Sequence, residues 1–393
     1  MAINRACIIL WCVIFAVGMW LAMHKPLWCD ELYGQKVTIE GSSWGKILTG
    51  RINNEGNNFP LYYAIQKAVT STAHFNLPDE LIKDFELPTE KRKYNLFVYP
   101  KGQILLRLLP DALTSSAIVF LVRFFWIREG IVVGFMAFLS ALTSGMVWRY
   151  WVEARPYPLW FLLTLLQALF LIQLITESGP SSRVKIRLMI CHWLLAVTAP
   201  LGFIQVIIAQ AVLFQFGQRR LMDHLWAGIL PVCGVLFFLN HRSSSALYMG
   251  TSPIGIIWLN FSYEQLSLLF FYFMALICLK VWVCNNTSIE QRPWKGLAHF
   301  SNLLMGFCLS IMIIAYIYWR WPQGQNGFPV LGRHFYFLSA LTVVMVPSMF
   351  SDLWLRSKGS PFWRGVFLVF FTVLLISQFI GSFGNAWVHG FYQ

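Results

Sequence analysis

Two adjacent carboxylates, Asp30 and Glu31, follow directly after the first apolar run of the chain. They stand among aromatic residues in the order Trp28-Cys29-Asp30-Glu31-Leu32-Tyr33, where a spanning helix would leave a bilayer. Neighbouring side chains diverge, so one carboxylate can face a reactant while the other orients basic groups. The alternative is a helix start that Asp30 caps, with Glu31 in the first turn. The pair alone leaves both interpretations open.

A second acid stands beside a base in the segment Tyr150-Trp151-Val152-Glu153-Ala154-Arg155-Pro156-Tyr157. Pro156 suits the first turn of the helix that follows. Glu153 and Arg155 could hold a substrate or could pair only with each other, and aromatic residues at this depth are also ordinary interfacial anchors. A further polar and aromatic group, Asn57-Asn58-Phe59-Pro60-Leu61-Tyr62-Tyr63, precedes an amphipathic stretch.

Arginines flank a late apolar run, with Arg320 before it and Arg333-His334 at its start. A guanidinium can grip a phosphate through two parallel hydrogen bonds. The alternative is that each arginine only extends toward lipid headgroups. No histidine stands at metal-ligand spacing from another, and the cysteines form no CxxC pair, so no metal site is predicted.

Apolar runs must position these groups, because the chain is 57% hydrophobic and only 12% charged. A soluble domain carries about a quarter charged residues, so the composition predicts an all-α membrane protein. The net charge of +13 comes from basic residues scattered singly between apolar runs, which argues against nucleic acid as a partner. We expect about eleven transmembrane helices, at 6–23, 108–127, 130–148, 157–176, 187–199, 201–217, 225–240, 264–283, 299–319, 335–350 and 365–384.

The domain organisation follows from these runs: 1–23 as a first transmembrane helix, 24–104 as an outer loop, and 105–393 as a polytopic domain. The first run could be a cleaved signal, but bulky Met19-Trp20-Leu21 favours an uncleaved anchor. Basic residues on both flanks of 187–220 predict a hairpin that turns at Thr198–Gly202. The same bias places the amino terminus inside, and the outer loop and carboxyl terminus outside.

The outer loop has its own expected pattern. Apolar positions at three- and four-residue spacing in 30–50 and 60–74 predict amphipathic helices on the membrane surface. The polar stretch 53–58 is a break between them, and 76–102 is charged and irregular, as an inserted lid would be.

Together these segments resemble the polytopic glycosyltransferases of the GT-C class, in particular the bacterial branch related to dolichyl-phosphate-mannose protein mannosyltransferases and to the lipid A aminoarabinose transferase. The resemblance covers most of the chain. Its motifs here are Asp30-Glu31, Asn58-Phe59-Pro60-Leu61-Tyr62-Tyr63, Arg107-Leu108-Leu109-Pro110, Glu153-Ala154-Arg155-Pro156-Tyr157 and Arg333-His334. The family's usual His and first Pro of the second motif are Asn58 and Phe59 here.

The resemblance implies transfer of a sugar from a polyprenyl-phosphate donor to a hydroxyl of a lipid, glycan or protein, with inversion, outside a bacterial inner membrane. Asp30 would be the base and Glu31 its helper or an organiser of the loop. The donor phosphate would bind Arg155, Arg333 and Arg320. Sugar or acceptor contacts would come from Glu153, Asn58, Tyr62, Tyr63, Tyr157 and His334.

Two other classes of protein remain open. A flippase or transporter would move a lipid-linked sugar with the same acids and arginines, although charges near the bilayer midplane and broken helices would then be expected. A catalytically inactive assembly subunit of an envelope glycan pathway would keep the topology and lose the need for Asp30.

Overall fold

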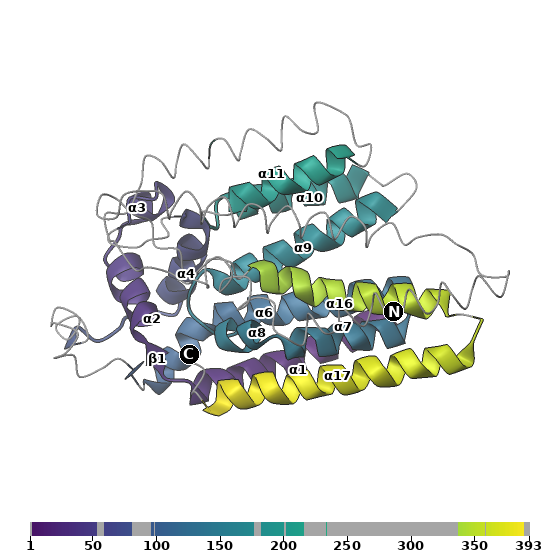
Figure 1. Ribbon diagram of the computed structural model, residues 1–393. Coiled ribbons are helices and arrows are strands. Elements are labelled where there is room, and N and C mark those ends of the chain that lie inside the picture. The colour runs from purple at the N-terminus through teal and green to yellow at the C-terminus, as the bar shows by residue number, and fades with distance from the viewer. Residues whose placement is uncertain are drawn as a thin grey trace, which may run out of the picture.

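The computed structural model describes residues 2–52, 59–80, 96–97, 99–176, 182–199, 202–215, 233, 337–357 and 359–388. These residues form a helical bundle with a group of short elements at one end (Figure 1). Four of the described helices are long and apolar enough to cross a membrane: Ile3–His24, Pro100–Glu129, Tyr157–Thr176 and Pro361–Gly384. The chain is therefore a helical membrane protein, as its composition predicts.

The bundle consists of α1 (Ala2–His24), α6 (Pro100–Glu129), α7 (Ile131–Thr143), α8 (Gly145–Tyr150), α9 (Tyr157–Thr176), α10 (Ser182–Ala196), α11 (Gly202–Gln215), α16 (Phe337–Arg356) and α17 (Pro361–Val388). Each expected apolar run inside the described residues coincides with helix. Apart from residue 233, the runs 225–240, 264–283 and 299–319 lie outside the described residues, and 335–350 begins outside them.

Two boundaries differ from the expectation. The run 130–148 is divided into α7 and α8, because Ser144 is extended and its hydroxyl accepts a hydrogen bond from the Val147 amide at 3.4 Å. Helix α6 begins at Pro100, eight residues before the apolar run, because proline suits a first helical turn. Its early turns carry polar residues and therefore gave no apolar signal.

The expected hairpin at Thr198–Gly202 is present. Helix α10 ends at Ala196 and α11 begins at Gly202, and the Gln210 Nε2 atom lies 3.2 Å from the Nδ1 atom of His192. Eighteen residues of continuous helix would separate these two positions by about 27 Å. The chain therefore folds back on itself here.

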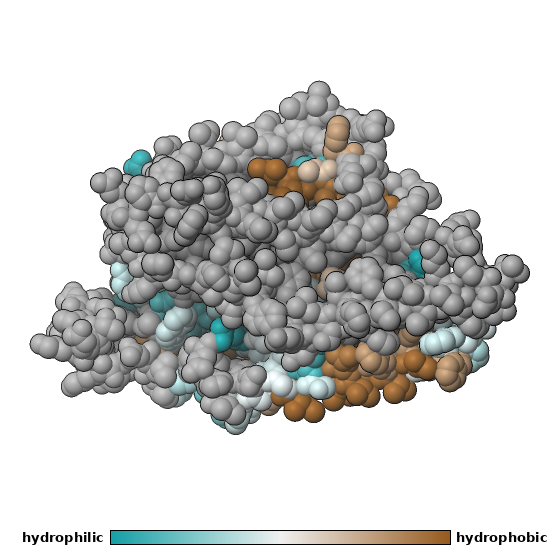
Figure 2. All heavy atoms as spheres, in the orientation of Figure 1, coloured by the Kyte–Doolittle hydropathy of each residue, from teal (hydrophilic) through white to brown (hydrophobic). Residues whose placement is uncertain are grey.

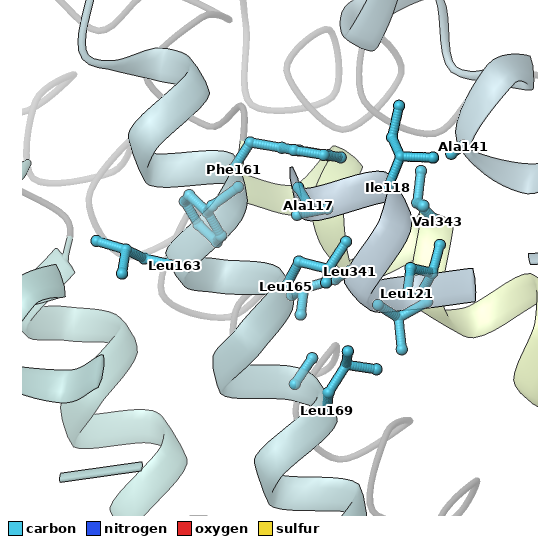
Figure 3. Packing of buried hydrophobic residues seen from close by; sticks show 14 of the residues in the cluster. Ala117, Ile118, Leu121, Ala141, Phe161, Leu163, Leu165, Leu169, Leu341 and Val343 are labelled. Carbon is cyan, nitrogen blue, oxygen red and sulfur yellow. The ribbon is translucent and has the colours of Figure 1, made fainter. Parts of the chain in front are cut away.

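Helix α6 lies at the centre of the bundle and packs against α1, α7 and α9. Figure 3 shows Ala117, Ile118 and Leu121 of α6 close to residues of α9 and α16. Small residues at such contacts let membrane helices approach closely, so that van der Waals packing holds them together.

Two prolines inside helices leave carbonyl groups without their usual donor, and neighbouring helices supply one. Pro110 cannot donate to the Leu106 carbonyl, which instead accepts from Gln66 Nε2 at 2.9 Å. Pro347 in α16 likewise cannot serve Val343, whose carbonyl accepts from Ser140 Oγ of α7 at 2.9 Å. Each freed carbonyl thus becomes a fixed contact between elements.

Helices α1 and α17 lie at the edge of the bundle, and their carboxyl-terminal ends meet, with the Trp20 and Trp387 rings stacked at 5.7 Å (Figure 1). Both expose aliphatic and aromatic side chains, and Figure 2 shows a hydrophobic band along this edge. A surface this apolar is unfavourable in water and is suited to contact with lipid chains. The exposed residues include Ile8, Ile9, Val13, Val17, Phe362, Val369, Val373, Ile376 and Ile380.

The polar segment stands at the end of the bundle where α1 and α17 finish (Figure 1). It contains β1 (Leu27–Trp28), α2 (Cys29–Tyr33), the π-helical turn η1 (Gly34–Glu40), α3 (Trp44–Leu48), α4 (Pro60–Thr72) and β2 (Leu96–Phe97), which pairs antiparallel with β1. The helices expected in 30–50 and 60–74 are thus present as several short elements. Most of the expected break at 53–58 and of the lid at 76–102 lies outside the described residues.

Candidate functional site

Glu31 is fully buried where the polar segment meets the bundle. Its Oε1 atom accepts from Arg107 Nε at 3.0 Å and from the Ala154 amide at 2.8 Å. Its Oε2 atom accepts from the Trp28 amide at 3.0 Å and from Arg107 Nη2 at 2.5 Å. Four donors occupy both oxygens, so Glu31 has the geometry of an organiser rather than of a base that takes a proton from a substrate.

Arg107 of α6 closes the carboxyl-terminal end of α1. Its Nη1 atom donates to the carbonyls of Ala22, at 3.1 Å, and Lys25, and Nη2 donates to the Pro26 carbonyl at 2.8 Å. The last carbonyls of a helix have no partner within the helix and carry partial negative charge, which suits a cation. Arg107 therefore joins α1, α2 and α6 at one point.

Lys25 is the second buried cation of this junction, and its Nζ donates to the Arg149 carbonyl at 2.7 Å. Burial lowers the pKa of Lys25 to about 8, although the negative charges of Glu153 and Glu31 act in the opposite direction. Lys25 and Arg107 together with Glu31 and Glu153 form a buried group of two cations and two anions. Such balance is what makes buried charges tolerable.

The same junction fixes the protonation state of Glu31. Burial raises the pKa of its carboxyl, but the Arg107 charge and hydrogen bonds, the Lys25 charge and the Ala154 amide outweigh burial. The pKa of Glu31 therefore lies below its ordinary value, and the side chain is a carboxylate at neutral pH.

Asp30 has a different environment from its neighbour. Its side chain is 29% exposed, and its Oδ2 lies 3.8 Å from Arg155 Nη2. Arg155 Nη1 also donates weakly to the Asp30 carbonyl, at 3.4 Å. The helix start that one interpretation of the pair proposed is present, with Glu31 in its first turn, but Trp28 rather than Asp30 stands at the cap position. Asp30 also lies in the first turn, and Glu31 reaches back to the Trp28 amide. Asp30 is thus an accessible carboxylate beside a cation.

Tyr62 and Tyr63 follow Pro60 at the start of α4 and are buried, with their rings packed edge to face at 5.7 Å. Burial and the charges of Glu31 and Glu153 raise the pKa of Tyr62 well above its ordinary value, and the Arg155 charge opposes this. Tyr62 is therefore close to both acidic motifs. Its hydroxyl has no hydrogen-bond partner within the described structure.

The turn between α8 and α9 carries Glu153, Arg155 and Tyr157. Glu153 is buried, and the Arg155 amide donates to the Glu153 carbonyl at 2.7 Å. The Tyr157 ring is also buried and lies 4.7 Å from the Tyr150 ring, on the other side of the turn. The turn is therefore an ordered, buried piece of backbone rather than an exposed loop.

The structure thus brings together Asp30, Glu31, Tyr62, Glu153 and Arg155, which belong to three separate motifs. Tyr63 packs against Tyr62, and Tyr157 packs against Tyr150. The other expected site residues, Asn58, Arg320, Arg333 and His334, lie outside the described residues.

Sequence reasoning did not assign roles to Lys25, Gln103, Arg107 or Asp111, all of which are buried at this junction or next to it. A signal was present. Gln103, Arg107 and Asp111 recur every four residues at the start of an apolar helix, which places them on one face. A polar stripe on a membrane helix indicates an inward face.

No group of three or more histidine, cysteine, aspartate or glutamate side chains in the described part of the chain is arranged to hold a metal ion. No family model, curated protein or solved structure matches the chain.

Proposed function

We propose that this protein is an integral membrane glycosyltransferase that moves a sugar from a polyprenyl-phosphate donor to an acceptor hydroxyl. The observation that carries the proposal is the pairing of an accessible carboxylate, Asp30, with the Arg155 guanidinium at 3.8 Å. The buried Glu31–Arg107 ion pair next to Asp30 holds this part of the chain in place. The resemblance of the motifs to GT-C enzymes supports the same assignment.

The two groups supply the base and the cation that such a reaction needs. Asp30 accepts the proton of the acceptor hydroxyl as its oxygen forms a bond to the anomeric carbon. The bond from that carbon to the donor phosphate breaks on the opposite face, which inverts the configuration. Arg155 stabilises the negative charge that develops on the departing lipid phosphate, and Arg320 and Arg333 are further candidates for this contact.

The neighbouring residues have supporting roles in the proposal. Glu31 keeps α2 in place and so orients Asp30, while Glu153, Tyr62, Tyr63, Tyr157, Asn58 and His334 are the candidates for sugar or acceptor contacts. The unbonded hydroxyl of Tyr62 supports this role, because a buried polar group normally has a partner and a bound sugar would supply one.

The proposal includes about eleven transmembrane helices, with the polar segment on the outer face of a bacterial inner membrane. The ends of α1 and α17 lie at the same end of the bundle as the polar segment, which supports placing all three on one side of the membrane. Cysteine labelling tests it. A membrane-impermeant reagent added outside should modify Lys46→Cys and should leave Gly359→Cys, which follows α16 at the other end, unmodified.

The decisive experiment compares sugar transfer by the purified protein in nanodiscs with that of two variants, using a panel of polyprenyl-phosphate sugars. Asp30→Asn should reduce turnover by about 10²- to 10⁴-fold while donor binding is retained. The control is Asp79→Asn, because Asp79 belongs to the same polar segment and its side chain is 88% exposed. Equal turnover in all three would remove Asp30 as the base. If wild type and both variants bind the donor but none transfers the sugar, the result would favour a flippase or a catalytically inactive assembly subunit.

A further inference from the structure

Helix α6 carries a row of four buried polar residues, Gln103, Arg107, Asp111 and Thr114. Their spacing of four, four and three residues places them on one face of the helix. Ser115 adds one contact beside the row. This face points away from lipid and toward the chain segments on which the candidate site is built.

The first two residues of the row bind the end of α1. Gln103 Nε2 lies 3.0 Å from the Met23 carbonyl and 2.9 Å from the Lys25 carbonyl, and Arg107 binds the carbonyls around them. Through Glu31, Arg107 also reaches the Ala154 amide. The upper part of the row therefore holds α2 and one point of the turn that carries Arg155.

The last two residues bind Trp151, four positions before Arg155. Asp111 Oδ1 accepts from Trp151 Nε1 at 2.9 Å, and Thr114 Oγ1 donates to the Trp151 carbonyl at 2.9 Å. One residue is thus held by its side chain and by its backbone. Two points thus fix Trp151 directly to α6, and a third, the Ala154 amide, is tied to the same helix through Glu31 and Arg107.

The two oxygens of Asp111 differ, because Oδ1 accepts a further hydrogen bond whereas Oδ2 is buried with no hydrogen-bond partner among the described residues. Ser115 Oγ donates to Oδ1 at 3.1 Å, and a Cβ atom added to Gly18 of α1 would lie 1.8 Å from Oδ1 and 2.7 Å from Oδ2. Helix α1 therefore passes directly against the carboxyl group and holds it toward Trp151. So close a helix leaves no room for an ion on that side of the group.

We propose that Asp111 is a positioning residue that acts through Trp151 to hold Arg155 against Asp30. The positional part stands on the contacts alone, and the catalytic consequence rests on the proposed glycosyltransferase function. The competing role for a carboxyl inside a spanning helix is to carry a proton or an ion.

The two roles predict different behaviour of variants. Asp111→Asn keeps an oxygen that accepts from the indole, so positioning should survive, whereas a proton or ion carrier would be lost. Asp111→Leu removes the acceptor and leaves the buried indole N–H without a partner. Trp151→Phe removes only the donor. The double variant, Asp111→Leu with Trp151→Phe, removes both partners of this bond and should be milder than Asp111→Leu, because no buried indole N–H is then left without an acceptor.

The test uses hydrogen–deuterium exchange of the full-length protein in nanodiscs, which needs no activity. Asp111→Leu should speed exchange in the peptide covering 151–156 by about tenfold, because the loss of one hydrogen bond raises the equilibrium population of the locally open state by about that factor. Helix α17 should stay protected, which serves as the control for folding. Asp111→Asn should match wild type. Trp151→Phe should show a smaller increase, and it provides the test if Asp111→Leu does not fold.

Unchanged exchange in both Asp111→Leu and Trp151→Phe would overturn the positioning role. Where transfer is measurable, Asp111→Leu should lower kcat with little change in donor KM, and Asp111→Asn should restore it. Loss of transfer in Asp111→Asn with normal exchange would also overturn the proposal, in favour of proton or ion binding. If wild type transfers no sugar, the proposed function fails while the exchange result still decides the positional claim.

Discussion

The Asp30 Oδ2 atom lies 3.8 Å from Arg155 Nη2, whereas its chain neighbour Glu31 binds Arg107 at 2.5 Å inside the protein. Adjacent acids thus have separate tasks, since one is accessible and loosely paired and the other is buried and saturated. The division follows from the first turn of α2, where successive side chains point in different directions.

Arg155 should contribute directly to donor affinity. We expect Arg155→Ala to weaken binding of a polyprenyl-phosphate sugar by roughly tenfold to a hundredfold, because a charge-assisted hydrogen bond to phosphate is lost. The donor affinity of Arg155→Lys should lie between those of wild type and Arg155→Ala, because lysine keeps the positive charge but cannot make the two parallel hydrogen bonds of a guanidinium. Binding to the protein in nanodiscs is the measurement, with the exposed Arg5→Ala as control. Equal affinity for Arg155→Ala would exclude a phosphate contact.

The Glu31–Arg107 pair should dominate the stability of the junction. Glu31→Gln leaves a buried guanidinium without its counter-charge, which typically costs about 3–5 kcal/mol. Replacing both residues, as Glu31→Gln with Arg107→Gln, should cost less than the sum of the two single changes, because neither charge is then left buried without its partner. Thermal unfolding in detergent measures this, and Asp79→Asn should change little because its ion pair is exposed. A double variant whose cost equals the sum of the two single costs would contradict the pairwise account.

Acid should remove the contribution of Glu31. Its folded-state pKa lies below the ordinary 4.5, so the unfolded chain takes up this proton first as pH falls. Stability from this group is complete above the ordinary value and is lost as pH drops through the folded one. Melting temperatures between about pH 7 and about pH 3 should therefore fall less steeply for Glu31→Gln than for wild type. Parallel slopes would show that the folded-state pKa is not lowered.

Gly18 should be intolerant of any side chain. A Cβ there would collide with the Asp111 carboxyl group, so Gly18→Ala must displace either α1 or that carboxyl from its contact with Trp151, at about 1–3 kcal/mol for overpacking. Gly365→Ala in α17 is the matched control, because no atom lies within 4 Å of its added Cβ, and it should be neutral or slightly stabilising. Melting temperatures compare the two, and equal effects would argue against close contact of α1 with Asp111.

Ser140 should matter only because Pro347 is present. Ser140→Ala leaves the Val343 carbonyl without a donor, at a cost of about 1 kcal/mol. In a Pro347→Ala background the helix supplies its own amide to that carbonyl, so adding Ser140→Ala should cost almost nothing. The four melting temperatures of this cycle provide the test. An equal cost in both backgrounds would mean that Ser140 acts otherwise.

The sequence was most informative where structure depends on local composition. Long apolar runs predicted α1, α9 and α17 closely, because the length and hydropathy of a spanning helix are properties of the run itself. The division at Ser144 was missed, since a capping serine hardly alters the hydropathy of its surroundings.

The junction itself was predicted only in part. The motifs of Asp30, Tyr62 and Arg155 were recognised, and the structure brings them together. Arg107 stood in a recognised motif but was given no role, and Lys25 was not singled out, because a single basic residue near the end of a span also suits a headgroup contact. Only the tertiary arrangement distinguishes the two, since the partners of Arg107 lie far away along the chain.

Those separations set an order of assembly during synthesis. Glu31 lies 76 residues before Arg107 and 123 residues before Ala154, the two partners that occupy its Oε1 atom. Because a chain is made and inserted from its amino terminus, the carboxylate emerges long before either partner exists. Water therefore solvates Glu31 until α6 arrives, and the junction closes only after the turn behind α8 has been made. Glu31 is thus fully removed from water only when Ala154, the later of its two partners, has been made.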